Sequence, residues 1–543
     1  MNKNFKNWLD SDLVSKEFKD EMITLSKEEI DLYFSDKKPS FGTAGIRQKM
    51  GAGTRRFNKF TYEQIAIGYA KHLLKSNMKL KVLIGHDNRR FSDEFTMVCA
   101  NVLTSFGIEV LIIKNNVLKA TPIISFLISY LKLDGGIIIT ASHNPKDYNG
   151  FKVYKETGGQ ILNDDAESII KRMPANDKVL ELSYVPNPYL ISEIDDRSIL
   201  EYFNQAKSCL INTNTIDTKN FPIIFTSHHG TASEDLPYFL YTLGYTKVIK
   251  AKEQCYPDSN FTNSPNSNPE DKDSFELSLK YANKHNADIM LGVDPDADRL
   301  AVAIRTKEGS FKYISGNEMG IIFTYYCLKN KDYKKAPFIV STFVSTNLID
   351  RIADDYGCKV FRTGTGFKWL SSVIEEKYKD MDFVVAFEEA IGSLNSTINR
   401  DKDSYQASAL ALEIFDFYRK QNMDLKELLE KEIYPKYGFW RGETISFMIK
   451  DLNWNERSIE MMEILKTTKL EEVCGVKLLD SRWNDEGDCL EWIFENDNSV
   501  RFRRSGTEPK FKAYFNMYGS TLEKAELNFN QFRREIKEIM KTL

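Results

Sequence analysis

The sequence lacks the features that mark secreted and disulfide-stapled proteins. Its seven cysteines are scattered over 543 residues, are odd in number and include no C-x-x-C pair. Such a set is typical of reduced thiols, and it excludes a disulfide framework as the basis of the fold. The first ten residues also lack the apolar segment that a secretory signal needs. We therefore expect a cytoplasmic protein.

A long apolar run and a surplus of one charge are absent as well. Residues 110–131 form the most apolar stretch, but Lys114, Asn115, Asn116 and Lys119 interrupt it, which excludes a clean membrane span. We expect a strand, a loop and a buried helix there instead. The 78 acidic residues nearly cancel the 74 basic ones, so the net charge of -4 predicts no attraction to a polyanion or a membrane surface.

Several missing motifs narrow the range of functions further. The sequence has no basic stripe, no zinc-ligand spacing and no aromatic RNA-binding signature, so we expect no nucleic-acid partner. It also has no G-x-x-x-x-G-K-S/T run, so nothing supports P-loop nucleotide binding. Any anion must be bound locally, by a few residues.

What is present indicates a globular protein of several domains. Hydrophobic residues make up 42% of the chain and charged residues 28%, and 543 residues exceed what one hydrophobic core usually serves. Short β-branched runs alternate with amphipathic stretches, a rhythm that predicts βαβ units. The predicted strands are residues 81–84, 109–113, 135–139, 221–225, 288–293, 338–341, 359–362 and 383–387, and predicted helices include 233–243 and 347–356.

The pattern changes after about residue 432. Residues 491–494 and 499–503 alternate polar and apolar side chains, as antiparallel strands do, and residues 522–543 have the pattern of an amphipathic helix. The sequence therefore predicts three similar α/β domains followed by an α+β domain. We place these domains at residues 1–205, 206–314, 315–432 and 433–543.

The motif richest in reactive groups is TASHNP at residues 140–145, directly after the predicted strand 135–139. Reactive groups of open α/β sheets collect at the carboxyl ends of strands, and Asn144-Pro145 favours a turn there. We therefore predict that Ser142 is an exposed nucleophile. The alternative is a polar turn in which Ser142 and Asn144 only satisfy backbone groups.

Three alternating carboxylates, those of Asp294, Asp296 and Asp298, follow the predicted strand 288–293. They do not fit an EF-hand, because its sixth position would be Arg299 instead of Gly and its twelfth Arg305 instead of Glu. Close like charges repel each other without a cation, and Mg²⁺ takes few carboxylates and adds phosphate oxygens or water. We predict one Mg²⁺ here. The alternative is an exposed acidic turn that caps a helix.

Two further segments complete a resemblance to the α-D-phosphohexomutase superfamily that spans the whole chain. FEEAIG at residues 387–392 resembles the sugar-recognition loop of that family, and RRSGTEPK at residues 503–510 resembles its phosphate-binding loop. The order and spacing of these two motifs and of the Ser142 and Asp294 loops make the resemblance specific. It implies a fold of four domains around a central cleft, three of them mixed α/β and the last α+β.

The resemblance implies an intramolecular phosphotransferase, an isomerase that interconverts hexose 1-phosphate and hexose 6-phosphate. Ser142 would carry a phosphoryl group held by Mg²⁺ on Asp294, Asp296 and Asp298. It would pass this group to one hydroxyl of the sugar phosphate. The resulting hexose 1,6-bisphosphate would reorient and return its other phosphate to Ser142. Sugar phosphates are the expected partners, and glucose 1,6-bisphosphate is the expected activator.

The same resemblance implies three more residues that would act around the phosphoserine. Lys152, ten residues after Ser142, resembles the acid/base lysine of the family. Arg47, at the end of FGTAGIR in residues 41–47, would steady the phosphoryl group. His143 would hydrogen-bond the phosphoserine or act with the metal loop. The alternatives are a solvated surface lysine at 152 and a turn histidine at 143.

The sugar and its second phosphate would be held by residues elsewhere in the chain. Glu388 would accept hydrogen bonds from ring hydroxyls, with Thr365 and Gly366 of TGTGFK at residues 363–368 and Arg299 beside the sugar. A guanidinium fork, hydroxyls and exposed backbone donors suit the phosphate. The residues implied for it are Arg503, Ser505, Gly506 and Thr507, with Arg400 and Lys402 assisting.

The choice of sugar stays open at this point. Ala390 replaces a serine found in one large branch of phosphoglucomutases, and Ser393 replaces a histidine of bifunctional phosphomannomutases. This loop, with GHDNR at residues 85–89, is most similar to the branch with phosphoglucomutase-2, phosphopentomutase and glucose-1,6-bisphosphate synthase activities. We expect a phosphoglucomutase, a phosphomannomutase or both. A phosphopentomutase acting on ribose or deoxyribose phosphates and a glucose-1,6-bisphosphate synthase are the alternatives.

Overall fold

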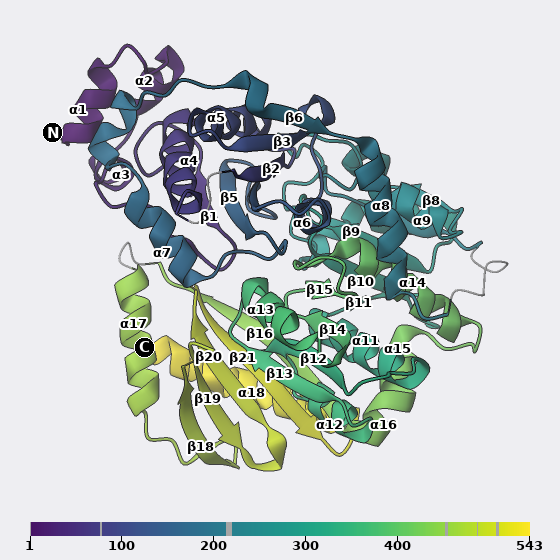
Figure 1. Cartoon of the computed structure of the whole chain (residues 1–543). Helices are drawn as coiled ribbons and strands as arrows, with labels where there is room; N and C mark the ends of the chain where they lie inside the picture. Colours follow the sequence, from purple (N-terminus) through teal and green to yellow (C-terminus); the bar gives the residue numbers. More distant parts are fainter. Residues whose placement is uncertain (1, 76–78, 213–219, 451–453, 486, 506–509) are drawn as a thin grey trace. The chain divides into compact units, whose positions relative to one another are not determined.

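The computed structural model describes residues 2–75, 79–212, 220–450, 454–485, 487–505 and 510–543 (Figure 1). The chain forms two compact units. The first contains Met1–Val302 and Ser396–Ala409, and the second contains Ala303–Asn395 and Leu410–Leu543. Within the described ranges, no helix is long and apolar enough to cross a membrane.

The first unit contains a mixed sheet with the strand order β1-β5-β4-β2-β3-β6 across its described residues. Strand β2 is parallel to both β3 and β4, β3 is parallel to β6, and β5 is antiparallel to β1 and β4. The elements of this part of the chain are α1 (Lys3–Asp10), α2 (Lys16–Met22), α3 (Lys27–Tyr33), β1 (Ile46–Lys49), α4 (Lys59–Leu73), β2 (Lys81–His86), α5 (Ser92–Ser105), β3 (Glu109–Ile113), α6 (Thr121–Tyr130), β4 (Gly135–Ile139), β5 (Tyr148–Lys155), α7 (Asn163–Arg172), β6 (Ile191–Ile194) and α8 (Asp196–Ala206).

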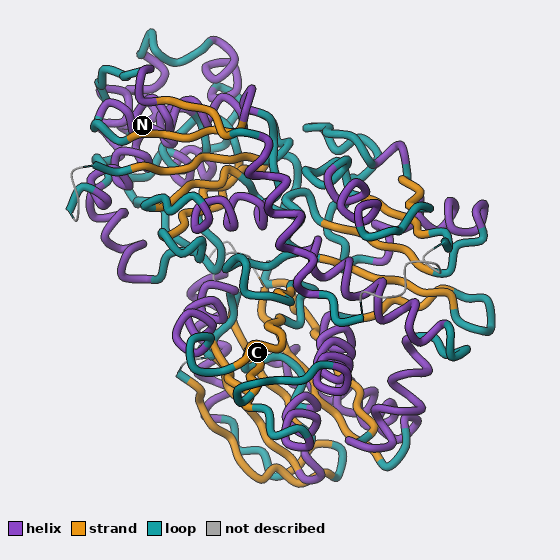
Figure 2. Tube along the Cα trace, turned by 45° about the vertical axis from the view of Figure 1, so that its right-hand side comes forward, coloured by secondary structure: helices purple, strands orange, loops and turns teal. Residues whose placement is uncertain are grey.

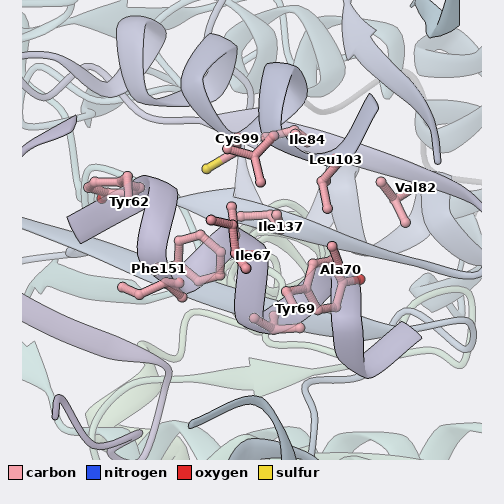
Figure 3. Close-up of a cluster of buried hydrophobic side chains, with 14 of the residues drawn as sticks. Tyr62, Ile67, Tyr69, Ala70, Val82, Ile84, Cys99, Leu103, Ile137 and Phe151 are labelled. Carbon is pink, nitrogen blue, oxygen red and sulfur yellow. The ribbon is translucent and has the colours of Figure 1, made fainter. Parts of the chain in front are cut away.

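Helices cover both faces of this sheet, so its central strands are buried on both sides. Consecutive residues Leu83 and Ile84 of β2 are both fully buried, as expected for strands in a parallel sheet between helices. Helices α4, α5 and α7 contribute to the core on one face. Figure 3 shows part of it, with Ile67 of α4, Ile137 of β4 and Phe151 of β5 close together. On the other face, the side chain of Ile124 in α6 packs over Gly85 of β2.

The three N-terminal helices α1 to α3 form a small cluster of their own. Trp8 lies edge-on to Phe34, with ring centroids 5.9 Å apart, and edge-on to Phe60 of α4, at 5.3 Å. These rings are buried together with Met22 and Val179. The cluster ties the start of the chain to the first sheet.

A second sheet in the first unit holds the strands β10, β9, β7 and β8 in that order. Strand β7 is parallel to β8 and β9. The division between the two units falls inside β10, after Val302, and residues Ser396–Ala409 return to the first unit with the start of α14. The elements are β7 (Ile223–Thr226), α9 (Asp235–Thr242), β8 (Val248–Lys250), α10 (Glu276–His285), β9 (Ile289–Val293), β10 (Leu300–Arg305) and α14 (Ser404–Arg419).

The second unit begins with another α/β layer. Its sheet has the order β13-β12-β14-β15, in which β12 is parallel to β13 and β14, and β15 is antiparallel to β14. The elements are β11 (Phe311–Ile314), α11 (Gly316–Asn330), β12 (Pro337–Thr342), α12 (Leu348–Asp355), β13 (Lys359–Thr363), α13 (Phe367–Lys377), β14 (Asp382–Phe387), β15 (Ser393–Leu394), α15 (Leu425–Glu427) and α16 (Tyr434–Tyr437).

The last sheet of the second unit is antiparallel, with the order β16-β21-β20-β19-β18-β17. Helices α17 and α18 pack with Trp492, Phe502 and Phe515 in the apolar core on one face of the sheet. Residues that alternate with these point to the other face, which is polar. The strands of this sheet are drawn in orange in Figure 2. The elements are β16 (Phe439–Met448), α17 (Trp454–Thr467), β17 (Glu472–Val473), β18 (Val476–Asn484), β19 (Cys489–Phe494), β20 (Ser499–Arg504), β21 (Lys510–Gly519) and α18 (Leu522–Thr542).

The predicted fold class is confirmed. The predicted strands 109–113 and 135–139 coincide with β3 and β4, and residues 110–131 form a strand, a loop and the buried helix α6. The C-terminal strands β19 and β20 are antiparallel, as their alternation indicated. The predicted helix 233–243 is shorter and spans Asp235–Thr242. The boundaries of the four predicted domains and the central cleft stay predictions.

Candidate active site

Ser142 lies in the loop that follows β4. Its φ of 53° is in the left-handed region, which residues other than glycine rarely adopt. The N–H of Ser142 donates to Thr140 Oγ1 at 2.9 Å, and its hydroxyl donates to Asp294 Oδ2 at 2.6 Å. The residue is 1% exposed, so the prediction of an exposed serine is wrong. The loop turns the hydroxyl inward, toward the carboxylate.

The Ser142 loop is held by Arg89, a residue for which the sequence suggested no role. Arg89 is 3% exposed and forms an ion pair with Asp87, with 3.2 Å between Nε and Oδ2. In the sequence, segment 85–89 indicated only the branch of the family, because the burial of an arginine cannot be read from its position after a strand. The guanidinium donates to four carbonyl oxygens, those of Ser142 (2.6 Å), Asn144 (2.5 Å), Pro145 (2.7 Å) and Tyr148 (2.9 Å).

Three carboxylates converge beyond the end of β9. Asp294, Asp296 and Asp298 are at most 1% exposed, and each offers an oxygen that lies within 4.8 Å of the other two. The backbone between them turns sharply, since Ala297 has a φ of 56°. Burial excludes the alternative of an exposed acidic turn.

The donor set fits a divalent cation. Asp296 Oδ1 and Asp298 Oδ1 are buried and find no hydrogen-bond partner among the residues that the structure describes. Such orphaned carboxylate oxygens are costly, and hard oxygen donors are the ligands of Mg²⁺. Two ammonium groups offset part of the negative charge. Lys152 Nζ lies 2.7 Å from Asp296 Oδ2 and 3.2 Å from Asp298 Oδ2, and Lys402 Nζ lies 2.7 Å from Asp298 Oδ2.

Burial and charge set the ionisation of this cluster. Burial raises the pKa of Asp294, and the charges of Asp296 and Asp298 raise it further. Burial alone would raise the pKa of Asp298, but the ammonium groups of Lys402 and Lys152 hold it well below its usual range. Burial lowers the pKa of Lys152, and the carboxylates of Asp296 and Asp298 outweigh this and raise it. Without a cation, Lys152 is therefore a charged counterion. It is fully buried, which excludes a surface lysine.

Two segments for which the sequence predicted no role support the metal loop. Thr121 at the start of α6 donates its hydroxyl to Asp296 Oδ2 at 3.0 Å. The N–H of Thr231 donates to the carbonyl oxygen of Pro295 at 2.8 Å. A Cβ atom at Gly230 would lie 2.3 Å from the Pro295 backbone, so only glycine allows this approach. Both contacts join segments far apart in the sequence.

Arg47, His143 and Arg299 also lie in the first unit, beside these loops. Arg47 Nη1 donates to Asn144 Oδ1 at 2.7 Å, and His143 Nδ1 lies 3.2 Å from Ser142 Oγ. Burial lowers the pKa of His143 well below its usual value, and the charges of Arg299 and Arg47 add to this. The imidazole is therefore neutral. Arg299 donates its backbone N–H to the Asp294 carboxylate at 3.0 Å.

The residues predicted to bind the sugar lie in the second unit. Glu388 follows β14, and its Oε1 accepts a hydrogen bond from the N–H of Gly366 at 2.8 Å. Gly366 has a φ of 110°, a conformation that favours glycine. The hydroxyl of Thr365 is buried and has no hydrogen-bond partner within the described part of the chain. These three residues form one group at the carboxyl ends of β13 and β14.

Two of the four residues predicted in the phosphate-binding loop are described. Arg503 lies near the end of β20, and Ser505 follows it, 8% exposed, with its N–H donating to the carbonyl oxygen of Lys510 at 2.9 Å. Gly506 and Thr507 lie outside the described residues. The two assisting residues lie instead in the first unit. Lys402 lies against Asp298, and Arg400 donates to the carbonyl oxygen of Asn399 at 2.8 Å.

Thus, the structure brings the predicted residues together in two sets, one in each unit. The first set contains Arg47, Ser142, His143, Lys152, Asp294, Asp296, Asp298, Arg299 and Lys402. The second contains Thr365, Gly366 and Glu388, with Arg503 and Ser505 on the C-terminal sheet.

Comparison with known proteins gives matches over most of the chain. Residues 38–180 match the family model of phosphoglucomutase/phosphomannomutase α/β/α domain I. Residues 200–309 match the model of domain II, and residues 315–437 match that of domain III.

Curated relatives and solved structures give a similar result. A phosphomannomutase of Mycoplasmoides pirum is 45% identical over 539 residues, 98% of each chain. A phosphoglucomutase of Staphylococcus epidermidis is 32% identical over 504 residues, which are 88% of this chain and 90% of the relative. The crystal structure of a phosphoglucomutase/phosphomannomutase family protein from Burkholderia thailandensis superposes with a TM-score of 0.70 at 18% identity. It covers 92% of this chain and 97% of that one, and it supports the fold.

Proposed function

Because the chain belongs to the phosphoglucomutase/phosphomannomutase family of the α-D-phosphohexomutase superfamily, we propose that it interconverts hexose 1-phosphates and hexose 6-phosphates. The family resemblance predicted from the sequence is confirmed, and so is the assignment to the mutases. One observation carries the proposal for this chain. The hydroxyl of Ser142 donates a hydrogen bond of 2.6 Å to Asp294, one of the three buried carboxylates Asp294, Asp296 and Asp298.

Ser142 is the residue that would carry the phosphoryl group. In the first half of the reaction, the bond between Ser142 Oγ and phosphorus would break, and a hydroxyl oxygen of the sugar phosphate would bond to phosphorus. In the second half, the other phosphate of the bisphosphate would return to Ser142. Asp294, Asp296 and Asp298 would hold Mg²⁺, which offsets the charge of a transferring phosphoryl group when it is bound.

Residues around the triad would position the phosphoryl group and move the proton. Lys152 is buried beside Asp296 and Asp298, where its amine could exchange the proton of the reacting hydroxyl. Arg47 and Lys402 would contact phosphate oxygens. The neutral His143 would form a hydrogen bond with the phosphorylated side chain of Ser142. The low exposure of the triad supports such roles, because electrostatic interactions are strong where water is excluded.

The second set of residues would hold the rest of the substrate. Glu388, oriented by the N–H of Gly366, would accept hydrogen bonds from sugar hydroxyls together with Thr365. Arg299, of the first set, would also contact the sugar. The non-reacting phosphate would bind Arg503, Ser505, Gly506 and Thr507. Glucose 1,6-bisphosphate would prime unphosphorylated Ser142. These assignments, and a cytoplasmic location, are part of the proposal.

The relatives include both phosphomannomutases and phosphoglucomutases, so the hexose must be determined by assay. We would compare kcat/KM for glucose 1-phosphate, mannose 1-phosphate and ribose 1-phosphate, with Mg²⁺ and a trace of glucose 1,6-bisphosphate. Ser142→Ala should abolish turnover and leave sugar-phosphate binding intact. Ser105→Ala, at the end of α5, is the matched control.

Each outcome of this assay is informative. Turnover of a hexose phosphate that is lost in Ser142→Ala and kept in Ser105→Ala would support the proposal. A strong preference for ribose 1-phosphate would show a phosphopentomutase instead. Undiminished turnover by Ser142→Ala would refute the phosphoserine mechanism.

A further inference from the structure

A cavity of about 470 Å³ lies within the second unit, apart from the residues proposed to bind the sugar and its phosphate. One wall comes from the loop after β12, from the start of α12 and from β13. The other wall is the polar face of the C-terminal sheet, with side chains of β18, β19, β20 and β21. The lining residues do not include Glu388, Gly366, Arg503 or Ser505.

The charged residues that line the cavity leave one positive charge in excess. Four are arginines and three are carboxylates. Arg351 pairs with Asp497, and Arg362 pairs with Asp350 at 2.6 Å. The remaining two arginines, Arg482 and Arg501, share the single carboxylate of Glu491, at 2.8 and 2.6 Å.

The two arginines that share Glu491 differ in exposure. The side chain of Arg482 is 58% exposed, whereas those of Arg501 and Glu491 are 9% and 7% exposed. Arg501 also donates to Asn347 Oδ1 at 3.0 Å, so Arg501 and Glu491 form a buried pair and the excess positive charge is that of Arg482. Because the lining carries this net charge, the cavity attracts an anion.

Two buried hydroxyl groups belong to the same wall. Ser499 and Tyr518 line the cavity and are 3% and 6% exposed. Neither hydroxyl has a hydrogen-bond partner among the described residues. Ser499 pairs with Asn516 in the register of β20 and β21, so Ser499, Arg501 and Tyr518 share one face of the sheet. Buried hydroxyls are seldom left unsatisfied.

We propose that this cavity binds a small organic molecule that carries a phosphate group. Two hydroxyl donors beside a guanidinium in excess suit a tetrahedral oxyanion, because hydrogen bonds to a charged acceptor are the strong ones. The cavity is larger than a phosphate ion, and its volume falls in the range of roughly 300–1,000 Å³ typical of ligand pockets. Phe343 and Ile493 provide apolar surface for the organic part.

Inorganic phosphate is the probe for the first test, by isothermal titration of the full chain. The titration uses the variant Arg503→Gln, which weakens the phosphate site proposed for catalysis. We expect this variant to keep one saturable phosphate site. Adding Ser499→Ala and Tyr518→Phe should lower its affinity at least tenfold. Both substitutions remove hydroxyls that make no hydrogen bond within the described structure, so folding should be unaffected.

Ser481→Ala is the control, because Ser481 is an exposed serine on β18 that does not line the cavity. Its phosphate affinity should equal that of Arg503→Gln alone. Unchanged affinity in the Ser499→Ala/Tyr518→Phe variant would overturn the proposal. So would the absence of saturable binding at millimolar phosphate. Tighter binding of citrate than of phosphate would show that the cavity selects carboxylates, which also contradicts it.

Discussion

The guanidinium of Arg89 donates a hydrogen bond of 2.6 Å to the carbonyl oxygen of Ser142, the residue whose hydroxyl meets Asp294. Three more carbonyl oxygens of the same loop accept hydrogen bonds from this group. One buried side chain therefore fixes the backbone at the proposed nucleophile and in the residues that follow it. This gives Arg89 a positioning role that can be separated from chemistry.

Replacing Arg89 by lysine should lower kcat while KM changes little. Lysine has three rotatable donors in place of a planar fork of five, so it cannot reproduce four fixed contacts. We expect kcat to fall about 100-fold, in line with the cost of misplacing a reacting group. The measurement is steady-state kinetics together with the fraction of Ser142 that becomes phosphorylated.

Arg90→Lys is the control for this experiment. Arg90 is exposed and pairs with Glu17 at 3.1 Å, so its replacement should leave both readouts unchanged. A loss of activity in Arg89→Lys with full phosphorylation of Ser142 and a raised KM would argue against positioning of the serine.

Asp296→Asn should weaken Mg²⁺ binding. The substitution removes one negative charge from the triad and replaces a carboxylate oxygen that has no partner within the described residues. Mg²⁺ prefers charged oxygen ligands, so we expect affinity to fall at least tenfold. Calorimetric titration of the unphosphorylated protein with MgCl₂ measures this without reference to turnover.

Asp288→Asn provides the comparison, since Asp288 is an exposed carboxylate just before the same strand, β9. It should bind Mg²⁺ like the wild type. Equal Mg²⁺ affinity in Asp296→Asn and Asp288→Asn would show that the three aspartates are not the metal site.

Glu388→Gln should impair use of the sugar. A hydrogen bond to a charged acceptor contributes about 1.5–3 kcal/mol, so kcat/KM for the preferred hexose phosphate should fall roughly 10- to 100-fold. Glu376→Gln, on the exposed surface of α13, should have no effect. Full activity of Glu388→Gln would exclude the proposed contact with the ring hydroxyls.

Gly150→Ala should destabilise the first unit. A Cβ atom at this position would lie 2.0 Å from the carbonyl oxygen of Thr140, on the backbone that leads into Ser142. Such overpacking costs about 1–3 kcal/mol or more, because the two backbones must separate. Urea unfolding should show a lower free energy of unfolding. At Gly107 nothing lies within 4 Å of the added atom and φ is 78°, so Gly107→Asn should be tolerated.

Features that depend only on residues close together in the sequence could be predicted. Strands β3 and β4 are buried β-branched runs, and their bounds followed from composition alone. The carboxylates of Asp294, Asp296 and Asp298 alternate along a short loop, so their convergence was also predictable. The resemblance to the family added roles for residues that pattern alone could not rank.

Features that depend on contacts between distant segments could not be predicted. The burial of Ser142 follows from its left-handed backbone and from a carboxylate far along the chain. The four contacts of Arg89 are made with backbone oxygens, which leave no mark in the identity of the residues that accept them. Arg482 and Arg501 both form ion pairs with Glu491. This arrangement depends on the pairing of β19 with its neighbours in the sheet, which the sequence does not show.

Ser142 and Ala297 both have φ in the left-handed region, at 53° and 56°. Each such residue costs about 1–2 kcal/mol relative to an ordinary conformation, a cost that glycine avoids. Selection for heat resistance and selection for catalysis therefore act in opposite directions at position 142. A directed-evolution experiment that screens for thermal tolerance without an activity screen should select Ser142→Gly, and so a more stable protein that lacks the proposed nucleophile.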